Sequence, residues 1–209
     1  MKVVSIWNPK GGQGKSMIAL NLAAAAVAIH DMKPFVLCRD PQGTAMLAYK
    51  EGNLPFIVDS HFPTDGDEYD LVIADHVAAD WEVPPAPTVI IPTKADRTQY
   101  ATFVDALERA EKATNPTRRI IQIITDGNPL LPLERTVIKA MKRAGAFEIH
   151  RSGVFSKAAE EYRSIFDPKM NKSYRVKDSR KEFEAILSAV LSSQSSLKDT
   201  QLEKEKAHA

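Results

Sequence analysis

The sequence predicts an α/β fold in which a mostly parallel, twisted sheet carries helices on both faces. Unbroken apolar runs rich in β-branched residues alternate along the chain with stretches of strong helix formers. A glycine-rich loop joins the first apolar run to the first helical stretch. Strands that are buried on both faces read as continuous apolar runs, which is typical of parallel sheets.

Six strands are expected, because each apolar run is short and is bounded by turn residues or by proline. The fourth run is followed by Pro92, and we expect the strand to stop there. The six predicted strands are residues 3–7, 34–38, 70–75, 88–92, 119–125 and 147–150.

Helices are expected between these strands, where strong helix formers occur without breakers. Thr98 is a candidate cap for the second helix, and Gly145 closes the third. The predicted helices are residues 16–30, 98–114, 133–143, 157–166 and 179–192. Two stretches rich in Pro, Asp and Gly, residues 59–69 and 76–88, are predicted to be surface loops.

Composition favours one domain without a membrane-spanning segment. The chain has 209 residues, a net charge of +1 and 44% hydrophobic residues, so residues 1–192 are predicted to form a single domain. The polar segment 193–209 is predicted to be a disordered tail. Cys38 is the single cysteine, which excludes an intrachain disulfide and fits a reducing cytoplasm. No secretory signal precedes the first strand, and the longest apolar stretch, 17–29, is too short to span a bilayer.

The segment NPKGGQGKS, residues 8–16, predicts a phosphate-binding loop and therefore a P-loop NTPase. Three glycines allow backbone N–H groups to turn towards phosphate oxygens, and the following helix presents its positive N-terminus to the same anion. Lys15 supplies a charge for the β- and γ-phosphates, and the Ser16 hydroxyl can bind Mg²⁺. A glycine-rich turn with incidental lysines is the alternative, which the flanking strand and helix disfavour.

The loop has the form K-G-G-x-G-K-S beginning at Lys10, and it resembles the deviant Walker A loop of the ParA/MinD superfamily. The start of the chain is most similar to small, ParF-like ParA plasmid partition proteins. The resemblance implies that Lys15 acts on ATP in cis, while Lys10 reaches the ATP of a partner subunit in a nucleotide sandwich dimer. It assigns nucleotide contacts to Gly11, Gly12, Gln13, Gly14, Lys15, Ser16 and Met17. Met17 stands where the family often has a second Ser or Thr.

Residues 38–45, CRDPQGTA, resemble the D-x-D-P-Q-G-N segment of that family. The match implies that Asp40 orients the attacking water, so that Lys10, Lys15 and Asp40 form the catalytic set. Gln42 and Gly43 match the switch that follows, and Cys38 replaces the first aspartate of the pattern. An ordinary turn is the alternative interpretation, because Asp, Pro and Gly are turn residues.

Asp75 ends an apolar strand, which places its carboxylate beside the phosphate loop in the manner of a Walker B motif. We therefore expect Ser16 and Asp75 to hold Mg²⁺. His76 follows it and is expected to be a solvent-facing loop residue. The segment beginning VIIPT resembles the family's adenine-bordering loop, which implies that Pro92 and Thr93 lie near the base.

A basic run in residues 168–181 contains six cations and one acid. Partition ATPases bind DNA without sequence preference, so the resemblance makes this run a candidate DNA surface; a solvated loop and helix start is the alternative. The candidates are Lys169, Lys172, Arg175, Lys177, Arg180 and Lys181, with Arg118 and Arg119 as a weaker second set. The tail has no apolar face of the kind that binds MinD to membranes. The one cysteine excludes a nitrogenase-reductase-like iron protein.

Together these features predict a weak Mg²⁺-dependent ATPase that segregates a plasmid or other replicon. It would dimerise around ATP, bind nonspecific DNA and respond to a centromere-binding, ParB- or ParG-like partner in the cytoplasm, in association with the nucleoid. A nearly inactive ATP-dependent switch, recruiting a partner in conjugative transfer or complex positioning, is the first alternative. A P-loop metabolic enzyme, such as a synthetase or small-molecule kinase, is the second.

Overall fold

A computed structural model describes residues 1–40, 43–64, 68–113 and 117–192. The chain forms a seven-stranded sheet in the order β3-β2-β4-β1-β5-β6-β7, and every pair of neighbouring strands is parallel. This arrangement confirms the predicted α/β, P-loop type of architecture. Strands β2, β3 and β4 lie on one side of β1 and strands β5, β6 and β7 lie on the other, so the direction in which strands are added reverses at β1. Parallel sheets bind ligands at such a switch point, and the loop after β1 lies there.

The strands are short and the connecting helices vary in length. The strands are β1 (Lys2–Ile6), β2 (Pro34–Cys38), β3 (Ile57–Asp59), β4 (Leu71–Asp75), β5 (Thr88–Lys94), β6 (Arg119–Thr125) and β7 (Phe147–Ile149). The helices are α1 (Lys15–His30), α2 (Thr44–Lys50), α3 (Arg97–Lys112), α4 (Pro132–Arg143), α5 (Gly153–Glu160), the 3₁₀ helix η2 (Pro168–Lys172) and α6 (Val176–Leu191). None of the helices in the described ranges is long and apolar enough to cross a membrane.

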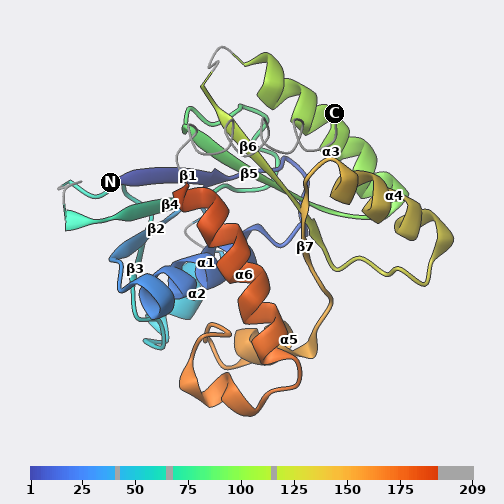
Figure 1. The fold of residues 1–209 in the computed structure, drawn as a ribbon. Coiled ribbons are helices and arrows are strands. Elements are labelled where there is room, and N and C mark those ends of the chain that lie inside the picture. The colour runs from blue at the N-terminus through green and yellow to red at the C-terminus, as the bar shows by residue number, and fades with distance from the viewer. Residues whose placement is uncertain (41–42, 65–67, 114–116, 193–209) are drawn as a thin grey trace, which may run out of the picture.

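Helices cover both faces of the sheet (Figure 1). Helices α1, α2 and α6 pack on one face, while α3 and α4 pack on the other, over β5 and β6. The first face is the larger core, and a second cluster around Trp7 and Phe103 fills the opposite side. The two cores pack against the two faces of the sheet, and they support the loops that follow the carboxyl ends of the strands.

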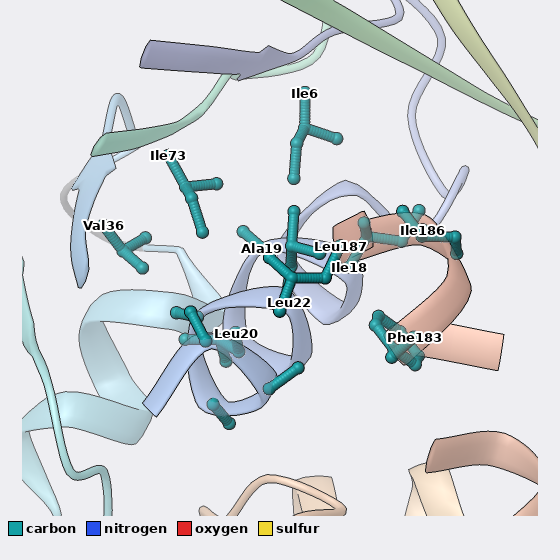
Figure 2. Close-up of a cluster of buried hydrophobic side chains, with 14 of the residues drawn as sticks. Ile6, Ile18, Ala19, Leu20, Leu22, Val36, Ile73, Phe183, Ile186 and Leu187 are labelled. Carbon is teal, nitrogen blue, oxygen red and sulfur yellow. The ribbon is translucent and has the colours of Figure 1, made fainter. Parts of the chain in front are cut away.

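Helix α1 is buried between the sheet and α6 (Figure 2). Ile18 and Leu22 pack among side chains of the sheet and of α6, and Phe183 packs from α6 on the far side. A run of four fully or almost fully buried alanines, 23–26, continues the helix. A helix that is apolar all round is buried on all sides, and small residues let its neighbours approach closely. The N-terminus of α1 is thereby fixed below the glycine loop.

Strand β5 runs through Pro92 to Lys94, so the prediction that Pro92 stops it is wrong. Strand β1 pairs with β5 only as far as Ile90, while β6 pairs with β5 to its end. The carbonyls of Ile90 and Pro92 both accept hydrogen bonds from the β1 side, from Trp7 N and Asn8 Nδ2. The N–H that proline lacks would therefore point to the side where β1 has already ended, and no ladder bond is lost.

Other boundaries also differ from the sequence prediction. Asp96, rather than Thr98, caps α3, because its carboxylate accepts hydrogen bonds from the N–H groups of Thr98 and Gln99. Ser152 caps α5, which runs from Gly153 to Glu160 instead of 157–166. The short elements α2 and β3 were not predicted, since seven and three residues are too few to show a clear period. The predicted tail, 193–209, lies outside the described residues.

Candidate functional site

A pocket of about 380 Å³ opens at the ends of β1, β2 and β4. The glycine loop and the start of α1 form its floor, and Phe155 and Ala158 of α5, with Tyr162 just after that helix, form part of its wall. Of the residues assigned to nucleotide, it brings together Gly11, Gly12, Gln13, Gly14, Lys15, Ser16 and Met17, along with Asp40 and Asp75. The α5 wall was missed by sequence analysis, because its residues lie far along the chain and carry no motif.

The glycine loop takes a backbone path that only glycine adopts easily. Gly12 and Gly14 have φ angles of 72° and 82°, in the left-handed region. Gly14 is also the N-cap of α1, and no side chain in the described part of the chain caps the first turn of that helix. Backbone N–H groups at this helix start remain available to an anion.

Lys15 is buried and folds back over the loop. Its ammonium donates hydrogen bonds to the carbonyls of Asn8, at 2.9 Å, and of Lys10, at 3.1 Å. Burial lowers the pKa of Lys15, and the nearby Asp75 carboxylate partly offsets this. A bound phosphate would stabilise the charged ammonium in the same way that Asp75 does.

The side chains of Gln13 and Asn8 hold the glycine loop in place by hydrogen bonds. The Gln13 carbonyl oxygen Oε1 accepts a hydrogen bond from Lys94 N at 3.0 Å, and its amide contacts Gln99 at the start of α3. Asn8 is fully buried; its amide donates to the Pro92 carbonyl and its oxygen accepts from Lys10 N, both at 2.8 Å. These hydrogen bonds attach the loop to the end of β5. The Gln13 side chain takes part in them, so Gln13 faces the pocket with its backbone.

Asp75 has the features of a metal-binding carboxylate. Only 3% of the residue is exposed, and its Oδ1 has no hydrogen-bond partner among the described residues. Burial raises the pKa of Asp75 to about 6, while a hydrogen bond from Ser16 and the charge of Lys15 act in the opposite direction. A buried carboxylate oxygen without a partner is costly, and a divalent cation beside Ser16 would satisfy it. The donor set of Asp75 and Ser16 thus fits Mg²⁺, which prefers oxygen ligands.

Asp40 and Cys38 lie on the side of the pocket formed by β2. Cys38 is aligned with Asp75 in the neighbouring strand, and its thiol donates to the Asp40 carbonyl at 2.9 Å. Burial raises the pKa of the thiol. Asp40 lines the pocket, and Gly43 N closes a turn onto the Asp40 carbonyl at 2.8 Å. The switch residue Gln42 lies outside the described residues.

His76 is buried, so the expectation of a solvent-facing histidine is wrong. Only 9% of it is exposed. The Asp80 carboxylate accepts a hydrogen bond from Nδ1 at 3.0 Å, and Nε2 lies 3.2 Å from the Ser5 hydroxyl. Burial lowers the pKa of His76, against the raising effect of Asp80. The side chain fastens the loop after β4 to β1, which helps to fix the adjacent Asp75.

Lys10 lies outside the pocket formed by its own chain. Its residue is half-buried, but the ammonium has no ion-pair or hydrogen-bond partner in the described part of the chain. Its main chain is held on both sides, by Asn8 and by the Lys15 ammonium. A fixed backbone with a free charged end can reach a group that this chain does not itself supply.

A second hollow of about 480 Å³ continues from the first across Gly12, Gly14 and Met17. Its walls are the ends of β5, β6 and β7, including Lys94, Asp126 and His150. Pro92 and Thr93 line neither hollow and are buried inside the sheet. Their assignment to the base stays a prediction that this geometry does not favour.

The basic run splits into exposed and engaged side chains. Arg180 donates to the carbonyls of Ile165 and Asp167 and stacks on Phe166, so it serves the fold. Arg175 forms an ion pair with Asp178. We call the four exposed members without an ion pair in the described residues the lysine set: Lys169, Lys172, Lys177 and Lys181.

The weaker pair of candidate DNA contacts is also engaged by the fold. The Arg118 guanidinium donates to the Pro84 and Ala110 carbonyls, and Arg119 donates to groups at the end of α6. Neither guanidinium is therefore as free to meet DNA as the lysine set is. Sequence alone does not distinguish such arginines from exposed ones.

Comparison with solved structures identifies the architecture. Apo McdA from Cyanothece superposes with a TM-score of 0.67 at 18% identity, covering 92% of this chain and 100% of that one. A protein described as a plasmid partition protein, from Borrelia burgdorferi and bound to AMPPNP, gives 0.68 at 18%, covering 90% and 97%. The chain has the fold of the ParA/MinD-type ATPases. MinD from Aquifex aeolicus also shares it, at 0.62 and 15%, covering 88% and 98%. No protein-family model and no curated protein matches the sequence.

Proposed function

We propose that the chain is a ParA-type ATPase that binds ATP–Mg²⁺ and positions or segregates DNA. The observation that carries the proposal is Asp75, whose unpartnered, buried carboxylate oxygen lies beside Ser16 and Lys15 at a glycine loop. Solved proteins with this fold include an McdA–ATP complex and the AMPPNP-bound Borrelia protein. In this chain the triphosphate would occupy the first hollow, and the nucleoside would continue into the second.

The residues divide the work of phosphoryl transfer. Lys15 and the loop N–H groups would bind the β- and γ-phosphates, and Ser16 and Asp75 would hold Mg²⁺, which neutralises charge on the phosphate oxygens. Asp40, on the pocket wall, would orient the attacking water. Lys10 would neutralise the triphosphate of a second copy, so that the dimer closes only when nucleotide is bound.

The DNA-binding part of the proposal rests on the lysine set. Lys177 and Lys181 lie four residues apart on α6 and therefore on one face of the helix, while Lys169 and Lys172 come from η2. A dimer would double the number of cations, and binding would be independent of sequence and sensitive to salt. A centromere-binding, ParB- or ParG-like partner would stimulate hydrolysis and release the dimer from DNA, within the cytoplasm and at the nucleoid.

A nearly inactive switch that recruits a partner is the second candidate, and Cys38 favours it. The family pattern has an acid at this place, and here a thiol without charge at neutral pH occupies the position aligned with Asp75. The two candidates differ in turnover and not in nucleotide binding.

The test is ATP turnover with and without DNA, with Asp40→Ala as the control. A wild-type rate above that of Asp40→Ala supports the ATPase, and a rate equal to it leaves the switch. ATP-dependent, salt-sensitive retention on DNA supports the DNA function, while retention that is independent of ATP would count against it.

A further inference from the structure

Among the described residues that line the second hollow, one carries a carboxylate: Asp126, which follows β6 directly. Asp126 has a φ of 54°, the left-handed region that residues other than glycine seldom adopt. Its N–H donates to the carbonyl of Ile149, at the end of β7, at 3.3 Å. An unusual backbone angle held by a neighbouring strand is a common feature of binding sites.

Two cations hold the Asp126 carboxylate in place. Lys94 Nζ lies 3.5 Å from Oδ2, and Arg151 Nε lies 3.4 Å from Oδ1. Lys94 ends β5 and Arg151 follows β7, so cations flank the carboxylate on both sides, and its side chain stays 40% exposed. A carboxylate can accept about four hydrogen bonds, and these contacts leave it able to accept more.

Two other polar side chains of the hollow, those of Thr125 and His150, are already engaged in hydrogen bonds. The Thr125 hydroxyl lies within hydrogen-bond distance of the carbonyls of Gln13 and Thr93. His150 Nδ1 is bonded to Glu182 on α6 at 2.8 Å. Asp126 is therefore the charged acceptor in this hollow that a ligand can use, and the ligand group it suits is an N–H donor.

We propose that Asp126 selects the nucleobase by accepting a hydrogen bond from an exocyclic amino group of a purine. The inference rests on the proposed nucleotide site and adds which bases that site accepts. Adenine carries an amino group at C6, guanine carries one at C2, and hypoxanthine carries neither. A carboxylate favours the donor and repels a carbonyl oxygen placed at the same point, so an analogue that lacks the amino group loses a hydrogen bond to a charged acceptor.

The experiment uses the full chain with Mg²⁺ and a ribose-labelled fluorescent ATP analogue, displaced by ATP, GTP or inosine triphosphate. The label leaves the base free. We expect ATP or GTP to bind at least about tenfold more tightly than inosine triphosphate, as a charge-assisted hydrogen bond would give. Preference for ATP places the recognised amine at C6, and preference for GTP places it at C2.

The test variant is Asp126→Gly, which removes the carboxylate while glycine tolerates the positive φ at this position. Asp126→Gly should bring the ratio between the preferred nucleotide and inosine triphosphate to within about threefold, mostly by weakening the preferred one. Asp105→Asn is the matched control, because Asp105 pairs with an arginine at 3.0 Å outside both hollows, and it should retain the ratio.

Equal binding of the three triphosphates by the wild type would overturn the inference. So would an unchanged ratio in Asp126→Gly. If the wild type binds none of the three, the nucleotide site itself is wrong, which is a different result from equal binding.

Discussion

Replacing Asp75 by asparagine should stabilise the metal-free protein and abolish its response to Mg²⁺-ATP. Burial raises the pKa of this carboxyl from 3.8 to about 6 in the folded state. The ionised form is therefore disfavoured by folding, by about 3 kcal/mol, taking 1.36 kcal/mol per pKa unit. Asparagine has nearly the same shape and no charge, so the variant avoids this penalty.

The sign of the pH dependence follows from proton uptake. Between the unfolded pKa and the folded pKa of Asp75, the folded state binds more protons, so its contribution to stability falls as the pH rises. Well below the unfolded pKa of 3.8 the carboxyl is protonated in both states and behaves like the amide. The advantage of Asp75→Asn should therefore grow from about pH 4 to about pH 6 and stay constant above that.

The measurement is urea unfolding with a chelator at pH 5 to 8, for the wild type and Asp75→Asn. Adding Mg²⁺-ATP at about a thousand times its Kd should stabilise the wild type by about 4 kcal/mol, enough to reverse the order of stability. The variant should gain little. A variant that is less stable than the wild type at pH 8, or a difference that does not change with pH, would refute the reasoning.

Three further changes test other parts of the structure. Replacing the lysine set by alanine should weaken ATP-dependent DNA binding and lower the salt slope of log K by up to about 0.9 per lysine in contact, read from titrations at several salt concentrations. Arg180→Ala should lower the free energy of unfolding by about 1–3 kcal/mol, because two carbonyls lose their donor. Urea unfolding measures this loss, and a salt slope of DNA binding equal to that of the wild type would show that Arg180 does not contact DNA. Cys38→Asp should destabilise the metal-free protein more at pH 7 than at pH 5, because it places a second carboxylate beside Asp75; equal loss at both pH values would contradict this.

Six of the seven strands, the parallel sheet and the phosphate loop could be predicted because the signals are local. Apolar runs, glycine spacing and a terminal aspartate identify β1, β4 and the start of α1, and parallel pairing then brings Asp75 to the loop. Pro92 misled the prediction because its missing N–H matters only if β1 continues beside it, which is a property of the sheet.

The rest of the site depends on contacts between distant segments. His76 was expected in solvent, but Ser5 and Asp80 bury it, and no local pattern shows that. Asp126 reads as a turn residue in its own segment, and it becomes part of a hollow only when β5 and β7 bring Lys94 and Arg151 to it. Arg180 resembles its basic neighbours in sequence, and its different role is set by carbonyls at the turn before η2.

The central claim is that Lys10 acts on the nucleotide of a second copy, and it is tested most directly by light scattering of the wild type and Lys10→Ala with and without Mg²⁺-ATP. Both proteins are measured in an Asp40→Ala background, which we expect to slow hydrolysis so that the ATP-bound state persists during the measurement. We expect the wild-type Lys10 protein to become a dimer with ATP, and Lys10→Ala to bind ATP as a monomer with an affinity near that of the wild-type monomer. A Lys10→Ala protein that dimerises normally with ATP would contradict the account.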